Sequence, residues 1–151
     1  MIEKTFNYPG FGRRIAAGFY DSVLLIAIIL VAVSVFTIGV EVVAGKNAST
    51  EILQTPWVKF IYQLYLVAVA ALFFIWFWSN GGQTLGMKVW KLRLVNSNNQ
   101  PLSYRQASLR LFMLVITCLP IGIGFIWMLF SKNRQTLYDR WSATYMVIEI
   151  N

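Results

Sequence analysis

The chain has 151 residues and a net charge of +7, and 58% of its residues are hydrophobic while only 13% are charged. A soluble domain usually carries about twice that charged fraction, so we expect one integral membrane domain over residues 1–151. The chain has no histidine and a single cysteine, which excludes an internal disulfide and removes the usual ligands and bases, so we expect no metal, no cofactor and no enzymatic activity.

The first apolar stretch, residues 22–40, carries no charge. As a helix that rises ~1.5 Å per residue it covers about 28 Å, close to the hydrocarbon thickness of a bilayer. We therefore predict a spanning helix that begins near Ile15 and ends before Glu41.

Asp21 lies at the start of this stretch, seven positions after Arg14, so the two fall on nearly one side of the helix. An acid near membrane depth is a functional-site candidate if a partner can be named. One interpretation is a carboxylate that binds a proton and a cation in turn. The other, which we favour for this residue, is a structural ion pair with Arg13, Arg14 or Arg140. Ala17 and its glycine neighbour make the same side small enough for close backbone contact.

A second apolar stretch, residues 60–79, ends in aromatic residues and predicts a second span. The connection over residues 41–59 is polar, and its charges cancel. After a glycine turn, the next segment mixes bases with apolar residues. Its first part predicts a short interfacial helix, and residues 91–95 alternate as a strand does. Gln83 and Thr84 are candidates to line a polar cavity, although such residues more often cap helix ends.

A third apolar run, residues 111–131, contains one proline and two glycines. These residues can kink a spanning helix or turn a re-entrant hairpin, and we leave both open. Ser103 and Gln106 have the spacing of a capping box at the start of the preceding helix. Residues 144–150 are β-branched and aromatic enough to form a closing strand.

An internal repeat links the middle of the chain to its end. SNGGQTL at residues 79–85 aligns with SKNRQTL at residues 131–137, 52 positions later. In this frame Gln135 and Thr136 share the cavity or capping role of the first copy. Each copy precedes a predicted strand, and the two strands can pair only if both lie on one face of the membrane. Chance over a short match is the alternative.

The distribution of lysine and arginine predicts the orientation. Residues 80–110 hold five bases and no acid, whereas the loop over residues 41–59 is balanced. We expect the N-terminus and the middle segment to lie in the cytoplasm. The charges of the C-terminal tail favour the same side, but by a smaller excess of bases. Anionic lipid headgroups are the expected partner, and nucleic acid is not. The bases expected to contact headgroups are Lys88, Lys91, Arg93, Arg105 and Arg110.

Three segments resemble the RDD family of membrane proteins: FGRRIAA followed by Asp21, GQTLGMK at residues 82–88, and RQTLYDRWSAT at residues 134–144. By this resemblance the named arginine is Arg13 or Arg14, and the named aspartates are Asp21 and Asp139. Tyr138 stands where the family often has histidine. Asp139 is then an ion ligand or, as we prefer, a partner of Arg13 or Arg14 that docks the tail on the first helix.

The resemblance implies an all-α protein of the bacterial inner membrane. We expect a small helical bundle with two spanning helices, a third broken or re-entrant apolar helix and a short cytoplasmic β-pair. It also implies a role in transport, in some members exchange of sodium or similar cations for protons, or a role as an accessory or assembly subunit of a larger complex. Because three apolar runs are few for a complete pathway, transport would require a homo-oligomer.

Overall fold

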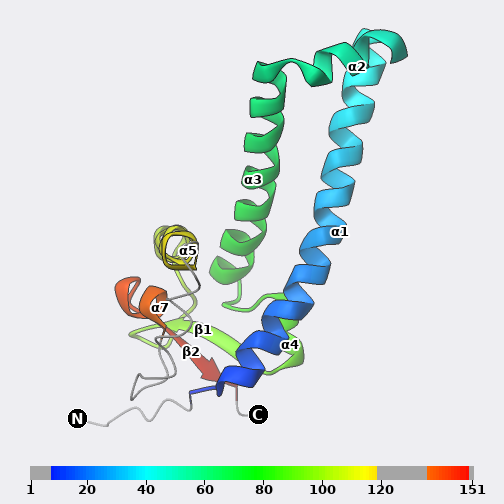
Figure 1. Ribbon diagram of the computed structural model, residues 1–151. Coiled ribbons are helices and arrows are strands. Elements are labelled where there is room, and N and C mark those ends of the chain that lie inside the picture. The colour runs from blue at the N-terminus through cyan, green and yellow to red at the C-terminus, as the bar shows by residue number, and fades with distance from the viewer. Residues whose placement is uncertain (1–7, 119–135, 150–151) are drawn as a thin grey trace, which may run out of the picture. The chain divides into compact units, whose positions relative to one another are not determined.

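The computed structural model describes residues 8–118 and 136–149. These residues form two compact units, Ser22–Phe73 and the combination of Met1–Asp21 with Phe74–Asn151. The elements, shown in Figure 1, are α1 (Phe11–Ala44), α2 (Lys46–Gln54), α3 (Pro56–Ser79), α4 (Leu85–Val89), β1 (Leu92–Asn96), α5 (Tyr104–Cys118), α7 (Leu137–Trp141) and β2 (Thr144–Ile148).

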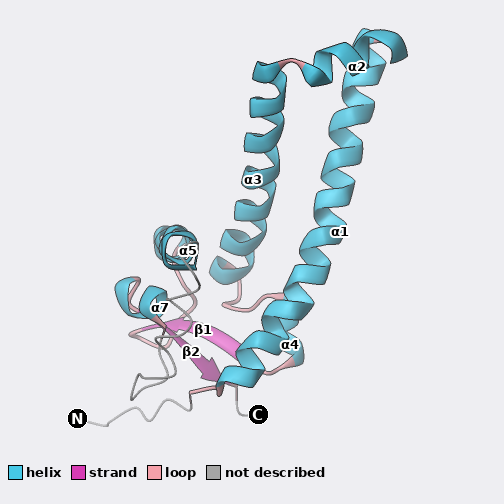
Figure 2. Ribbon diagram, viewed as in Figure 1, coloured by secondary structure: helices cyan, strands magenta, loops and turns pink. Residues whose placement is uncertain are grey.

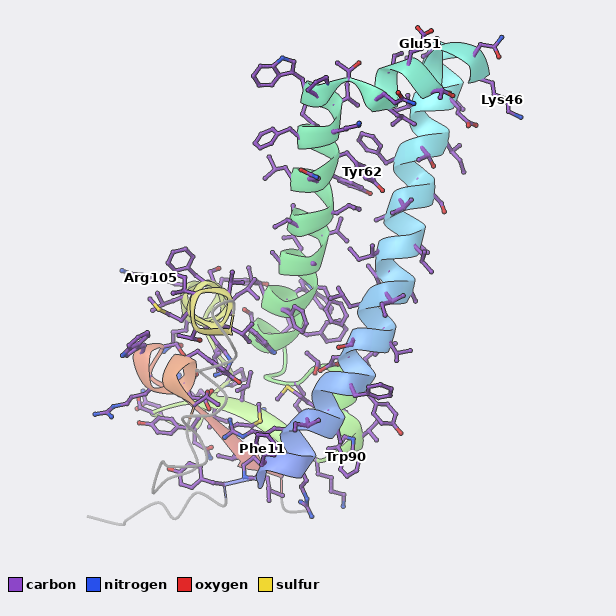
Figure 3. The ribbon with its side chains drawn as sticks, viewed as in Figure 1. Phe11, Lys46, Glu51, Tyr62, Trp90 and Arg105 are labelled. Atoms are coloured by element: carbon purple, nitrogen blue, oxygen red, sulfur yellow. The ribbon has the colours of Figure 1, made fainter. Side chains whose placement is uncertain are left out.

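The unit Ser22–Phe73 holds most of the two long apolar helices, which run antiparallel with α2 between them in the chain (Figure 1). The ring of Phe36 on α1 lies 5.0 Å from that of Tyr62 and 5.6 Å from that of Tyr65 on α3. Figure 3 shows Tyr62 on the side of α3 that faces α1. Only 6% of the most apolar part of each helix is buried. A core helix of a soluble protein would be mostly buried, so these are two candidate membrane-spanning helices, as predicted.

The residues of α1 would not favour a helix in water, because valine and isoleucine prefer strands. In lipid a segment must satisfy its own backbone hydrogen bonds, which a helix does completely. The polar side chains in the span follow the same rule. Ser34 Oγ donates to the carbonyl of Leu30 at 2.9 Å, and Thr37 Oγ1 donates to that of Val33 at 3.0 Å.

The helices extend beyond the predicted bounds, since α1 continues to Ala44 and α3 already begins at Pro56. Proline suits a first helical position because its ring fixes φ and the missing N–H has no helical partner there. The connection predicted as polar contains the helix α2, which the sequence analysis did not predict. Its side chains include Lys46 and Glu51, which are labelled in Figure 3.

In the other unit, β1 and β2 form a two-stranded antiparallel sheet with Leu94 opposite Met146 (Figure 2). These two residues are equivalent in the 52-residue repeat, so the pair is centred on a local two-fold relation. The strands also share one pattern of burial. The two predicted strands therefore pair with each other, as the repeat suggested.

The local structure around each strand repeats as well. Thr84 and Thr136 each cap a five-residue helix by accepting, at 3.3 Å, the backbone N–H of the residue three positions on. Just before each strand, Lys91 and Ala143 adopt left-handed backbone with φ of 53° and 50°. The cap, the short helix, the left-handed turn and the strand therefore recur in both copies of the repeat predicted from the sequence.

The core of this unit lies between the sheet and the helices around it. It consists of Ala17, Trp78, Met87, Leu92, Leu94, Leu102, Ala107 and Met146. At the start of α5, Gln106 Oε1 accepts from the backbone N–H of Ser103 at 3.1 Å, and Ser103 Oγ accepts from that of Gln106 at 3.3 Å, which confirms the predicted capping box. The predicted break in the third apolar run falls within residues 119–135, outside the described residues.

Candidate functional site

Asp139 lies in the first turn of α7 and is completely buried. Its Oδ2 accepts from Arg14 Nη1 of α1 at 2.7 Å, and its Oδ1 accepts from Arg110 Nη1 of α5. The carboxylate also accepts from the backbone N–H of Thr136 at 3.2 Å, which completes a capping box. One carboxylate thus joins three helices, and it docks the tail on the first helix as predicted.

Arg110 was predicted to contact lipid headgroups, but its side chain lies inside this cluster and is only 1% exposed. Its guanidinium lies between the rings of Trp78 and Tyr138, 5.3 Å and 5.0 Å from their centroids. It also donates to Thr144 Oγ1 of β2 at 2.6 Å. A buried guanidinium with an anion, a hydroxyl and two aromatic faces around it is held in place by its neighbours.

The cluster sets the protonation of its members. Burial alone would raise the pKa of Asp139, but the guanidinium groups of Arg110 and Arg14 outweigh burial and lower it from the ordinary value of 3.8. Burial, followed by the nearby Asp139 carboxylate, raises the pKa of Tyr138 to about 12. At neutral pH the cluster is therefore a fixed arrangement of two cations, one anion and a neutral phenol.

Asp21 has a different environment, although it is also only 6% exposed. Its Oδ2 accepts from Thr84 Oγ1 at 2.5 Å, and its Oδ1 accepts from the backbone N–H of Gly86 at 2.9 Å. Both donors are neutral and belong to the start of α4. Among the described residues, no arginine or lysine forms an ion pair with Asp21.

The prediction that an arginine holds Asp21 was therefore wrong. Arg14 lies about two turns, or roughly 10 Å, further toward the N-terminus of α1. At that level it meets Asp139 of α7 instead. Arg13 and Arg140, the other proposed partners, are exposed. One face of α1 thus contacts two different helices. Asp21 bonds to the start of α4, and Arg14 pairs with Asp139 of α7.

Gly86 explains how α4 approaches α1 so closely. A Cβ atom at this position would collide with the backbone carbonyl oxygen of Ala17 and lie 2.8 Å from Asp21 Oδ1. Ala17 itself is only 3% exposed. The small-residue side of the first helix, predicted to permit close contact, is used within this chain.

The four residues predicted to line a polar cavity or to cap helix ends have different roles in the structure. Thr84 and Thr136 are fully buried caps, as the alternative interpretation had it. Gln83 lines a polar cavity together with Lys88, Lys91 and Glu149. Gln135 lies outside the described residues.

The five bases predicted to contact lipid headgroups differ in their exposure. Lys88, Lys91 and Arg105 are exposed and Arg93 is partly so, and Figure 3 shows Arg105 pointing away from α5. The prediction for Arg110 was wrong, because a residue 1% exposed cannot reach a lipid headgroup. Arg110 lies three positions after the fully buried Ala107, on the inward side of α5, and no feature of the sequence marked that side.

Among the part of the chain that the structure describes, no three histidine, cysteine, aspartate or glutamate residues gather as a metal site. The family model that matches the chain is that of the RDD family, over residues 8–143. No curated protein and no solved structure matches it.

Proposed function

The chain belongs to the RDD family of membrane proteins, and on this premise we propose that it serves in transport, exchanging a cation such as sodium for a proton. The observation that carries the proposal is the environment of Asp21. This buried carboxylate accepts hydrogen bonds from a hydroxyl and a backbone amide, and no described residue neutralises its charge. It lies directly before the uncharged stretch of α1.

The two aspartates are suited to different roles. Each oxygen of Asp139 already faces a guanidinium, so a proton or a metal cation would have to displace a buried arginine. Asp21 has only neutral donors, so it can be neutralised by a proton or by a cation without breaking an ion pair. Competition between these two ligands for one carboxylate is the basis of exchange. We therefore assign the exchange to Asp21 and a structural role to the cluster of Asp139, Arg14 and Arg110.

We also propose an oligomeric state, a membrane and an orientation for the protein. Because two described spanning helices are few for a pathway, we propose that the protein works as a homo-oligomer. We place it in the bacterial inner membrane with the N-terminus, the sheet and the C-terminus in the cytoplasm, on the distribution of bases. Anionic headgroups are its proposed lipid partners, and its proposed role is not enzymatic.

A second candidate function is a scaffold or assembly subunit of a larger membrane complex. It is favoured by an apolar hollow of about 440 Å³ on the unit Ser22–Phe73, formed where α1 meets α2. At its centre Gly39 is exposed, and a Cβ there would meet nothing within 4 Å. Small residues on an open helix surface allow another helix to approach closely.

Flux measurements separate these functions. The purified protein is reconstituted into liposomes that contain a pH-sensitive dye, and gradients of sodium, lithium or potassium are applied. We expect proton movement with the wild-type protein and the level of empty liposomes with Asp21→Asn. Glu51→Gln, which removes an exposed acid from α2, is the matched control and should behave as wild type. Absence of flux from the wild type, together with a partner that co-purifies at fixed stoichiometry, would favour the scaffold.

A further inference from the structure

A polar cavity of about 300 Å³ opens beside the sheet and is lined by Gln83, Lys88, Lys91 and Glu149. We propose that this cavity binds a phosphate group, either the headgroup of an anionic lipid or a soluble phosphate. The proposal does not depend on transport, because the hydrogen bonds to Asp21 come from Thr84 and Gly86, which do not line this cavity.

The balance of charge in the cavity favours an anion. Glu149 is already engaged, since its Oε2 accepts from Gln83 Nε2 at 2.7 Å and its Oε1 lies 3.6 Å from Arg93 Nη1. Lys88 and Lys91 are both exposed, and neither forms an ion pair with a described residue. Two lysines therefore line one cavity whose acid is paired with another cation, Arg93.

The second copy of the repeat shows that the left-handed turn before the strand does not require a lysine. Arg140 occupies the position of Lys88, but Ala143 occupies the position of Lys91 and makes the same left-handed turn. The position equivalent to Glu149 in the first copy is Ser97. Since alanine serves the turn equally well, the ammonium group of Lys91 is free to serve a ligand.

The anchoring of α4 to α1 also favours a lipid phosphate as the ligand. Lys88 is part of α4, and the start of α4 is fixed to α1 through Asp21. The uncharged stretch of α1 begins at the next residue. Lys88 therefore belongs to a helix anchored at the residue that precedes the first apolar stretch, and lipid headgroups lie where a span leaves the hydrocarbon.

The chemistry of the donors indicates the kind of phosphate. Ammonium groups bind phosphate as point charges, and the amide of Gln83 adds a polar contact at the rim. A phosphate monoester carries about −1.5 to −2 charges near neutral pH, which matches two lysines better than a diester does. We expect phosphatidic acid to bind more tightly than phosphatidylcholine, whose own choline cation offsets its phosphate.

The test uses the full chain purified in detergent, with phosphatidic acid, phosphatidylcholine and inorganic phosphate as probes. Native mass spectrometry reports lipid retained by the protein, and added inorganic phosphate reports competition. The variant Lys88→Gln/Lys91→Gln should retain phosphatidic acid about tenfold less or weaker still. The control Lys46→Gln/Lys59→Gln removes the same charge from exposed sites that were not predicted to contact headgroups, and it should change retention less than about twofold. Unfolding curves of both variants show whether they remain folded.

Each outcome decides the proposal. Loss of phosphatidic acid in the lysine variant alone supports a lipid phosphate, and displacement by inorganic phosphate supports a soluble one. Equal losses in both variants would mean that only bulk charge attracts the lipid and would overturn the proposal. Equal retention of both lipids by the wild type, without binding of inorganic phosphate, would overturn it too.

Discussion

Asp139 pairs with two buried arginines through one carboxylate, so both ion pairs depend on that single residue. Its lowered pKa keeps it ionised at neutral pH. The pairing of Arg14 with Asp139 could be anticipated from the sequence, because both residues lie in segments that resemble the RDD family. The partnership with Arg110 could not, because a base at the edge of an apolar run has the same pattern as a headgroup contact.

Replacing Asp139 with asparagine should lower the free energy of unfolding by about 3–5 kcal/mol, because two guanidinium groups would remain buried without a full counter-charge. Denaturant unfolding in detergent, followed by tryptophan fluorescence, measures the change. Arg140→Gln alters the charge of the next residue, which is exposed, and should change stability by less than about 0.5 kcal/mol. Similar losses in the two variants would contradict a specific role for Asp139.

Tyr138 provides a pH dependence with a definite sign. Its pKa is raised to about 12 in the folded protein, from an ordinary value of 10.0. Its neutral phenol therefore contributes stability that is fully present below pH 10.0 and is lost as the pH rises from 10.0 through about 12. The difference in unfolding free energy between the wild type and Tyr138→Phe should be constant below pH 10.0, and the wild type should lose stability relative to the variant as the pH rises through the window. A constant difference across the window would refute the assignment.

At the scale of elements, the close contact between α4 and α1 requires a glycine at position 86. Gly86→Ala should detach α4 from α1 or strain both, because the new Cβ meets the rigid carbonyl of Ala17. We expect a loss of about 1–3 kcal/mol, the usual cost of overpacking. Gly81→Ala is the matched control, since a Cβ there would meet nothing within 4 Å. Thermal unfolding of the two variants compares them, and equal midpoints would show that the close contact is absent.

The elements themselves were largely predictable. Uncharged apolar runs and alternation identify the spans and both strands, because these patterns follow directly from burial in lipid and in a sheet. The helix α2 was missed because its segment, Lys46–Gln54, has little apolar content to set a period. The docking of α4 through Gly86 was missed for a different reason. A glycine in a turn-rich segment has the same sequence pattern whether it serves a turn or a close backbone contact.

At the scale of the whole molecule, the two-fold repeat and the first helix have separate tasks. The two copies supply matching caps, short helices and strands, while α1 breaks the symmetry by giving Asp21 to one copy and Arg14 to the other. The repeat was visible in the sequence, but the different partners of the two aspartates were not. They depend on the level along α1 at which each short helix docks, which spacing alone does not fix.

The central claim is that Asp21 holds a proton which a cation can replace. The direct measurement is proton release from the detergent-solubilised protein in weak buffer when sodium, lithium or potassium chloride is added. The wild type and Glu51→Gln should release protons in a saturable manner, and Asp21→Asn should release none. Saturable release that persists in Asp21→Asn, or no release from the wild type with any of these cations, would contradict the account.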